Sequence, residues 1–506
     1  MDQSNARTLI LSGVAAAVVV RFLFHLRKVY TSPLATLPGP WWLPLLESRT
    51  LIAIGCTLSG WTVYPLKHLA VHRKYGPVAR VGTTWISLAR PDIARYILQS
   101  DAIDKPAFVY KTFRYNEYGD NLFTALDHGE HKRMRKAIAP AFGIQHLRSV
   151  EGGFYENFGI LATQLDKLID ASPNGEIHEN VWQKLKLFMA DCLGDSAFGG
   201  SFGSMTSTTG AAKVPDLVYA IFSKKVLMSV LSFLKYFPNP ILHDAHAKTS
   251  ELAAIIEPLI DDRIAGKTRR ADLLQVLVDG ASASDTDGPL GDAERLARNE
   301  IVSNSLLFLS GGINSTSRTM AFMLISLIRN PIAYKKLQQE IDNTPVDPLT
   351  GYIPPEVCKQ LPYLNACINE TLRLHGVTWV VRDLNRDVRF GEFFFPKGTS
   401  VMVPLFVLMR DPDVWENADA FIPERFLDGS KKDAAGFLPF SSGEYNCIGR
   451  NFALNVTKIC IANLLKRFEF GDVDPNHSLE LIVDGFTSLR YLPYMMTVRK
   501  HRTVEE

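Results

Sequence analysis

The sequence predicts a mainly α-helical fold with a minor β region, preceded by an apolar helix at the N-terminus. Three observations lead to this prediction. The chain has 506 residues, of which 46% are apolar and 21% are charged, so it can bury a large core. Apolar residues recur at helical spacing through residues 150–264 and 294–374. Short runs in residues 78–89 and 390–404 alternate around glycine or proline turns, which is typical of strands.

The N-terminal segment predicts a membrane anchor. Residues 8–24 are largely apolar with Arg21 as their only charge, slightly fewer than the roughly 20 residues that a bilayer span needs. Arg27 and Lys28 follow the apolar run, so the positive-inside rule places the rest of the chain in the cytosol. A cleaved signal peptide is the alternative, but the small residues lie inside the run instead of after it. We therefore expect residues 1–30 to form a single-pass transmembrane helix.

A stiff hinge is predicted next, in residues 31–46, because Pro33, Pro38 and Pro40 restrict the backbone. Residues 47–506 follow as the main domain. The formal net charge of +2 gives no reason to expect nucleic acid as a partner. The sequence does not indicate an oligomeric state.

The six cysteines show neither the spacing of a disulfide framework nor that of a paired metal site. Five of them are expected to be ordinary buried thiols in a reducing compartment. These five are Cys56, Cys192, Cys358, Cys367 and Cys460.

Cys447 differs, because a glycine-punctuated loop delivers it to the start of an apolar helix. Phe440, Gly443 and Gly449 surround it in this loop. A helix N-terminus and a cationic metal both favour a thiolate, through unsatisfied backbone N–H groups and through charge. Gly443 and Gly449 can adopt backbone angles closed to other residues, so the loop can press against a flat cofactor. The pattern therefore suits a thiolate ligand.

This loop resembles the haem-binding loop of the cytochrome P450 family, whose pattern is Phe-x-x-Gly-x-basic-x-Cys-x-Gly. The resemblance implies the cytochrome P450 fold for residues 47–506, haem b as the cofactor, and Cys447 as the axial ligand of its iron. The loop residues expected to lie against the haem are Phe440, Gly443, Tyr445 and Gly449. Tyr445 departs from the family pattern, which usually has Arg or His facing a haem propionate. The alternative, an ordinary buried cysteine, is opposed by further matches in the expected order.

One such match joins Glu370, Arg373 and Arg425. Glu370 and Arg373 are three residues apart and so lie on one face of a helix. The family has a Glu-x-x-Arg pair here and an arginine at the position of Arg425. The resemblance implies a structural role, in which the carboxylate is held between two guanidinium groups. A solvated surface pair is the alternative.

Another match concerns basic residues. Arg382 and Arg135 match family positions whose guanidinium groups meet haem propionates. His131 stands four residues before Arg135, where the family has Trp or His. This spacing places His131 and Arg135 on one helical face, from which both could reach a carboxylate. The alternative is a solvated basic run on a helix.

A long helix is predicted in residues 292–330, far above the usual helix length. Gly311 and Gly312 stand near its middle, at a cost of about 1 kcal/mol each relative to alanine. They match the family's groove for dioxygen, which is commonly (Ala or Gly)-Gly-x-(Asp or Glu)-Thr. The alternative is that these glycines only let two helices cross closely.

The match in this groove is partial. Asn314 stands at the position of the acid and Ser315 at that of the alcohol, with Thr316 next. A serine hydroxyl can hold a water near oxygen, whereas an amide cannot release a proton at neutral pH. By resemblance, Ser315, Asn314 and Thr316 are the candidate catalytic residues.

The resemblance implies a haem-thiolate monooxygenase that inserts one oxygen atom from O2 into a lipophilic small molecule, such as a terpenoid, steroid or polyketide. Thiolate ligation favours cleavage of the O–O bond. It further implies electrons from NADPH through an NADPH–cytochrome reductase, and a place in the endoplasmic reticulum membrane with the catalytic domain in the cytosol. Residues 105–121, 307–313, 377–380 and 486–488 are expected to line the substrate pocket.

Two alternatives to this function stay open. Asn314 would also suit a haem-thiolate isomerase or dehydratase that works without a reductase. The other alternative is a haem sensor without catalytic activity. Dependence of turnover on NADPH and a reductase separates the three.

Overall fold

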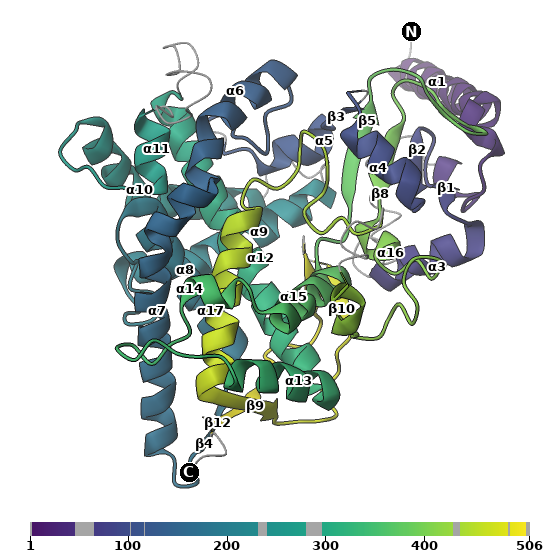
Figure 1. Cartoon of the computed structure of the whole chain (residues 1–506). Coiled ribbons are helices and arrows are strands. Elements are labelled where there is room, and N and C mark those ends of the chain that lie inside the picture. Colours follow the sequence, from purple (N-terminus) through teal and green to yellow (C-terminus); the bar gives the residue numbers. More distant parts are fainter. Residues whose placement is uncertain are drawn as a thin grey trace.

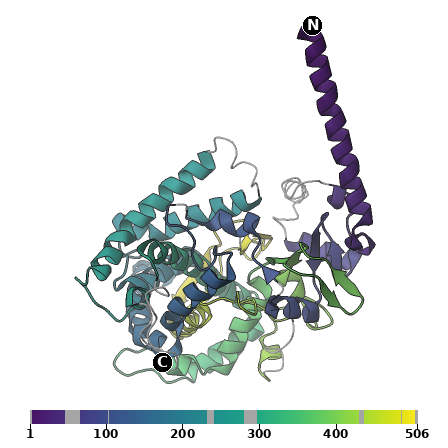
Figure 2. The same cartoon turned by 90° about the horizontal axis from the view of Figure 1, so that it is seen from above.

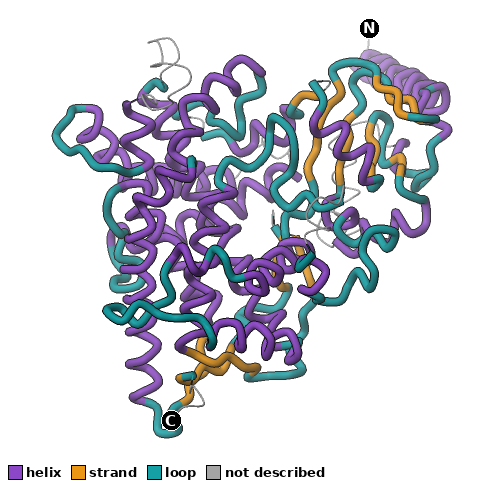
Figure 3. The backbone as a smooth tube through the Cα atoms, viewed as in Figure 1, coloured by secondary structure: helices purple, strands orange, loops and turns teal. Residues whose placement is uncertain are grey.

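The structure is a computed structural model that describes residues 3–45, 65–101, 103–115, 117–230, 240–279, 296–428, 436–483 and 486–501. It confirms a mainly helical fold with a small β region (Figure 1). Helices fill most of the body, and most strands lie next to the N-terminal helix or near the C-terminus (Figure 3).

The helical part is built around α12, which crosses the centre of the body (Figure 1). Its helices are α6 (His128–Ile138), α7 (Ile144–Ala171), α8 (Val181–Leu193), α9 (Val214–Val230), α10 (Pro240–Ile264), α11 (Leu273–Asp279), α12 (Arg298–Ile328), α13 (Pro331–Asp342), α14 (Pro355–Cys358), α15 (Pro362–His375) and α17 (Arg450–Arg467). α12 packs against α8, α9, α10, α15 and α17, so it is buried on most sides. It is the long helix that the sequence predicts, although residues 292–295 lie outside the described part.

Five strands form the largest sheet, in the order β1 (Val78–Arg80), β2 (Trp85–Leu88), β8 (Ser400–Val403), β5 (Val380–Leu384) and β3 (Ile103–Asp104). β2 and β8 are parallel, and the other neighbours are antiparallel. The strands predicted in residues 78–89 are β1 and β2. Residues 390–404 contribute to two sheets, because β7 (Phe393–Phe395) pairs with β6 (Val388–Phe390) while β8 joins the large sheet.

Two small sheets complete the β region. One has the order β4 (Glu176–Glu179), β12 (Met496–Lys500) and β9 (Phe468–Asp472), and the other pairs β10 (Leu481–Val483) with β11 (Thr487–Leu489). Near the large sheet lie the helices α3 (Pro65–Tyr75), α4 (Pro91–Gln99), α5 (Ala107–Tyr110) and α16 (Leu405–Leu408).

The N-terminal helix α1 (Gln3–Thr31) extends away from the body (Figure 2). Its C-terminal end is attached to the sheet, because Arg80 Nη1 donates a hydrogen bond of 3.0 Å to the Val29 carbonyl oxygen. In the described part of the chain, none of the helices combines enough length with enough apolar character for a membrane span. The structure thus confirms a helix in this segment. It does not support the prediction that residues 1–30 span a membrane.

The predicted hinge contains two short 3-10 helices, Pro33–Thr36 and Leu43–Leu45, and residue 46 lies outside the described part. His25 Nε2 lies 3.1 Å from the Pro44 carbonyl oxygen, and the Thr83 hydroxyl donates to the same oxygen at 2.9 Å. These contacts join the segment to α1 and to the turn between β1 and β2.

Glu370, Arg373 and Arg425 lie in contact, and the first two are completely buried on α15. Arg373 donates to both carboxylate oxygens of Glu370 at 2.7 and 2.8 Å, and Arg425 Nε donates to one of them at 3.2 Å. Arg373 also donates to the carbonyl oxygens of Met409 and Ala418, each at 2.7 Å. One carboxylate and two guanidinium groups thus tie α15 to the segment that leads to the cysteine loop.

The first prediction concerns this cluster. Glu370→Gln should lower the free energy of unfolding by about 3 to 5 kcal/mol, because two buried guanidinium groups lose their carboxylate. Arg386→Gln is the control, since it breaks an exposed pair with Asp101 and should leave the stability nearly unchanged. Denaturant unfolding followed by circular dichroism measures both. A Glu370→Gln variant as stable as the control would contradict a structural role for the cluster.

His375, at the end of α15, stacks on Phe322 with ring centroids 4.2 Å apart and planes at 2°. Its Nδ1 has no hydrogen-bond partner. Burial, together with the charges of Arg410 and Arg373, lowers its pKa from 6.5 to about 3. The imidazole is therefore neutral in the folded protein at neutral pH.

The second prediction follows from this pKa. Below pH 6.5 the unfolded chain binds a proton at His375 that the folded chain does not bind, so the stability present above this pH is lost as the pH falls toward 3. The loss amounts to at most about 1.4 kcal/mol per pH unit. His375→Phe keeps the stacking and should flatten this part of the curve of unfolding free energy against pH. Identical slopes for the variant and the natural protein would contradict the assignment.

Candidate active site

The loop before α17 owes its shape to Gly443. Its φ is +73°, in the region that favours glycine, and a Cβ there would collide with the backbone oxygen of Leu98 at the end of α4. The N–H of Cys447 donates to the Phe440 carbonyl oxygen at 3.0 Å. The loop is thus pressed against α4, and it holds Cys447 just before α17.

The Cys447 residue has accessible surface even though the surrounding protein shields its thiol from water. Burial raises the pKa of the thiol, while the backbone N–H groups of Gly449 and Arg450 and the charge of Arg135 lower it in part. The helix start therefore favours the thiolate, as predicted, but a metal cation has to supply the rest of the stabilisation.

Gly443 uses the backbone angles closed to other residues that the sequence allows at both loop glycines, but Gly449 does not. Its φ of −80° and ψ of 7° are open to any residue. A Cβ at this position would lie 4.0 Å from Cys447 Sγ. The missing side chain of Gly449 leaves the space next to the sulfur open.

The other described cysteines behave as the sequence predicts. Burial raises the pKa of each of these thiols, none of which has the accessible surface of Cys447. They are Cys192, Cys358, Cys367 and Cys460. Cys56 lies outside the described residues.

His131 and Arg135 are brought to the cysteine loop by α6. Arg135 donates to the carbonyl oxygen of Asn446 at 3.0 Å and to its side-chain oxygen. His131 is buried, and its Nδ1 lies 3.2 Å from a carboxylate oxygen of Glu444. Burial and the charge of Lys105 lower the pKa of His131 to about 4, so its imidazole is neutral at neutral pH.

Two further cations lie on the ring of Tyr445. The guanidinium carbon of Arg382, on β5, is 5.1 Å from the ring centroid, and the Lys105 ammonium nitrogen is 4.9 Å from it. Arg382 is buried, donates to the Tyr110 hydroxyl, and has an Nε without a hydrogen-bond partner. Burial and the charge of Arg382 lower the pKa of Lys105 to about 7. A buried lysine thus lies beside the position where Tyr445 replaces a basic residue.

Sequence reasoning missed Lys105 as a partner of the haem edge, although it placed the residue in a pocket-lining segment. A single lysine in a loop has no pattern that separates a buried role from a solvated one. The one available signal was Tyr445. Because it stands where the family has a basic residue, another cation is needed to face the haem propionate. His128, which approaches the Tyr445 hydroxyl at 3.1 Å, was missed for the same reason.

One stripe of α12 is open, although most of this helix is buried. Gly311 is exposed, and Leu307, Ser315 and Thr319 at four-residue spacing are partly exposed. A Cβ on Gly311 would meet nothing within 4 Å, so the stripe faces open space. The Ser315 hydroxyl donates to the Gly311 carbonyl oxygen at 2.6 Å, within the helix itself.

The neighbouring positions on α12 have other surroundings. A Cβ on Gly312 would lie 2.7 Å from a methyl group of Leu193, so this glycine lets α12 and α8 cross closely. Asn314 and Thr316 are each 2% exposed, and the Asn314 Nδ2 and Thr316 Oγ1 have no hydrogen-bond partner. Of the three candidate catalytic residues, only Ser315 lies on the open stripe.

These residues fit a haem held by Cys447. The thiol of Cys447 provides the soft ligand that a thiolate-bound haem requires. Haem carries two carboxylates, and Arg135, Arg382 and Lys105 are cations of the kind that bind them. The unpartnered Nε of Arg382 is a donor that the protein itself leaves unused.

Aromatic side chains join the segments that the sequence predicts around the substrate. Phe113 lies 5.9 Å from Phe222 on α9, and Phe222 stacks on Phe486 at 5.3 Å with planes 16° apart. The Tyr115 hydroxyl is 2.8 Å from the Ser310 hydroxyl on α12. Three of the four predicted segments therefore meet, and we name the rings of Phe113, Phe222 and Phe486 the aromatic chain.

The fourth segment, residues 377–380, adjoins the others, because Thr487 donates to the Gly376 carbonyl oxygen at 2.9 Å. Phe222 was not predicted to line the pocket. Apolar residues are spread over the whole of α9, so the sequence does not show which face of that helix meets the site.

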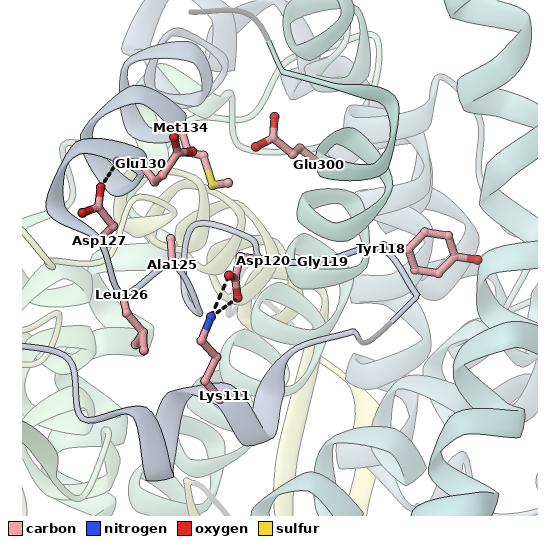
Figure 4. A pocket seen from close by; sticks show the side chains of 10 residues that line it. All are labelled: Lys111, Tyr118, Gly119, Asp120, Ala125, Leu126, Asp127, Glu130, Met134 and Glu300. Atoms are coloured by element: carbon pink, nitrogen blue, oxygen red, sulfur yellow. Dashed lines mark hydrogen bonds and ion pairs between the residues drawn. The ribbon is translucent and has the colours of Figure 1, made fainter.

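A separate cavity of about 500 Å³ lies between α6 and the start of α12 (Figure 4). Its charged residues already have partners: Lys111 binds Asp120 at 2.7 Å, and Glu300 accepts a hydrogen bond from the N–H of residue 297 at 2.8 Å. Neither Cys447 nor Ser315 lines it. This cavity is therefore distinct from the site around the cysteine loop.

Comparison with known proteins agrees with this geometry. The family model for Cytochrome P450 matches residues 50–494. The chain is 27% identical over 475 residues to cytochrome P450 monooxygenase acrD of Aspergillus aculeatus, a match that covers 92% of this chain and 90% of that protein. It is 26% identical over 486 residues to human cytochrome P450 3A7, with 90% of each chain covered.

Cytochrome P450 monooxygenase FUS8 of Gibberella fujikuroi is 26% identical over 466 residues, which cover 90% of this chain and 87% of that protein. The family match includes both the cysteine loop and α12. This match covers most of the chain, including Cys447 before α17 and the open stripe of α12, so the chain belongs to the cytochrome P450 family and is a haem-thiolate monooxygenase.

Proposed function

We propose that this protein inserts one oxygen atom from O2 into a lipophilic small molecule, with electrons from NADPH through an NADPH–cytochrome reductase. One observation carries the proposal: Cys447 is an exposed cysteine just before α17, and the stripe of α12 around Gly311 faces open space. Haem bound to a thiolate supplies the chemistry that cleaves the O–O bond. The aromatic chain favours a substrate of the terpenoid, steroid or polyketide kind.

Ser315 is the residue to which we assign proton handling. Its hydroxyl donates to the Gly311 carbonyl oxygen, so its own lone pairs stay available to accept a hydrogen bond from water. Asn314 can orient water, but its amide cannot release a proton at neutral pH. Thr316 is buried and is the next alcohol along the helix.

We assign the cationic side chains near Tyr445 and the cysteine loop to the binding of the haem propionates. Arg135 and Arg382 carry permanent charge, and Lys105 adds a third cation. Tyr445 contributes a neutral hydroxyl, and His131 is a neutral imidazole. Neutral groups among three cations reduce the repulsion between like charges.

One observation favours a second candidate function. Asn314 lacks the acid that proton delivery to oxygen commonly uses, which suits an isomerase or dehydratase that needs no reductase. Among the described residues, none favours a haem sensor without activity. Dependence on reductant therefore decides between the two enzymatic proposals.

We also propose that α1 attaches the protein to the endoplasmic reticulum membrane, with the catalytic domain in the cytosol. Apolar side chains on this helix are about half exposed or more, as membrane-binding surfaces are. They are Val19, Val20, Phe22, Leu23 and Phe24. Arg27 and Lys28 follow them and suit the headgroups of the cytosolic face.

The third prediction tests the reaction class. Purified protein should convert a lipophilic substrate only when NADPH, reductase and O2 are all present, and isotope-labelled O2 should place one labelled atom in the product. Mass spectrometry of the product measures this. Full conversion without NADPH and reductase would favour the isomerase or dehydratase.

The fourth prediction tests the role of Ser315 on the open stripe of α12. Ser315→Ala should divert reducing equivalents to peroxide and lower the product formed per NADPH by about tenfold or more, while the ferric spectrum stays normal. Ser315→Thr keeps a hydroxyl and should be tolerated, and Asn314→Ala should cost less than Ser315→Ala. Product and NADPH are measured in each variant. Full coupling in Ser315→Ala would shift the role to another group, with Thr316 next.

A further inference from the structure

Lys225, on α9, is a buried cation that the proposed reaction does not use. The residue is 9% exposed, and its ammonium group donates to the carbonyl oxygens of Phe113 at 3.1 Å and Arg114 at 2.8 Å. No carboxylate among the described residues pairs with it, and burial alone lowers its pKa to about 7. A buried cation without a counter-ion is rare and costly, so this lysine calls for an explanation.

The neighbouring charges do not provide one. Lys224, the preceding residue, forms an ion pair with Asp244, and Lys111 pairs with Asp120 at 2.7 Å. Glu117 is exposed in the same pocket wall. The cations around Lys225 have their own carboxylates, whereas Lys225, within the described part of the chain, contacts two carbonyl oxygens and the ring of Tyr115.

A pocket of about 200 Å³ opens at Lys225, between α9, α10 and the segment that follows β3. Phe108 and Met228 give it apolar walls. Arg114 also lines it, with an Nε that lies 3.7 Å from an oxygen of Asp120 and has no hydrogen-bond partner. Four cationic side chains thus line this small pocket, those of Lys111, Arg114, Lys224 and Lys225.

The pocket lies close to α12, the helix that carries the open stripe. The Lys225 ammonium nitrogen is 3.8 Å from the centroid of the Tyr115 ring, and the Tyr115 hydroxyl is 2.8 Å from the hydroxyl of Ser310, the residue before Gly311. The aromatic chain begins at Phe113, whose carbonyl oxygen Lys225 binds. Lys225 is thus linked to α12 through Tyr115 and to the start of the aromatic chain through Phe113.

We propose that Lys225 binds an acidic group of the substrate, so that the substrate class is an amphipathic carboxylic acid whose apolar part extends toward α12. The proposal rests on the proposed monooxygenase function and names the substrate class of that site. The carboxylate supplies the missing counter-ion and accepts a charge-assisted hydrogen bond from the ammonium group. The two backbone carbonyl oxygens carry only partial negative charges, so they do not neutralise the positive charge of the ammonium group. A carboxylate would neutralise it.

The test uses the full-length holoprotein and pairs of probes that differ only in charge. Decanoic, dodecanoic and hexadecanoic acids and their methyl esters are titrated, and the change in the ferric haem spectrum gives each dissociation constant. At least one acid should bind about tenfold more tightly than its ester. Lys225→Met keeps the length of the side chain without its charge, so the preference should disappear while the ester binds as before. Lys225→Gln is a second uncharged variant with the same expectation.

Lys224→Met is the matched control, because it removes the adjacent lysine and should leave the preference for acids intact. Equal affinity of acids and esters in the natural protein, no binding of any acid, or an unchanged preference in Lys225→Met would each overturn the proposal. A parallel loss of acid and ester affinity would also overturn it, since Lys225 would then only tie α9 to residues 113–114. Loss of the response to imidazole, a direct haem ligand, would instead count against the proposed haem site.

Discussion

The thiol of Cys447 is surrounded by protein that opposes its ionisation, and the rest of the site is arranged around this constraint. Burial raises its pKa, and only the N–H groups at the start of α17 and two nearby arginines act in the other direction. Gly443 fixes this arrangement by pressing the loop onto α4. A thiolate becomes stable here when a metal cation adds its charge, so ligand and cofactor depend on each other.

The structure contains several buried cationic side chains. Those paired with a carboxylate of the protein stabilise the fold, whereas those without such a partner suit the binding of a charged ligand. Glu370 supplies a carboxylate to Arg373 and Arg425, so this cluster is complete without a ligand. Arg382 and Lys105 share an aromatic ring and, among the described residues, form no ion pair with a carboxylate, which suits the propionates of a haem. Lys225 on α9 likewise has no carboxylate partner among the described residues, and we assign the missing charge to a substrate.

The sequence predicted those parts of the site that sit on regular elements at fixed spacing. Glu370 and Arg373 share one turn of α15, and His131 and Arg135 share one face of α6, so helical periodicity alone places each pair together. The long central helix and the first strand pair followed from hydrophobic patterning in the same way.

The parts that the sequence missed depend on contacts between distant segments. Lys105 and Lys225 are lysines whose sequence neighbours do not distinguish burial from exposure. The sequence offered a close helix crossing as the alternative role of the two glycines, but not that α8 and Leu193 are the partner of Gly312. β7 and β8 belong to different sheets although they are close in sequence. The helix of the predicted anchor is present. Whether it binds a membrane depends on its contact with lipid, which the sequence does not encode as a fold.

The position of the haem ligand is tested most directly by the carbon monoxide spectrum of the reduced protein with Cys447→Ser. The account predicts that the band typical of thiolate ligation disappears while the circular dichroism spectrum stays that of a folded helical protein. Cys460→Ser, which changes a buried cysteine on α17, should keep the band. A thiolate-type band of full intensity in Cys447→Ser would show that another residue binds the iron, and would contradict the account.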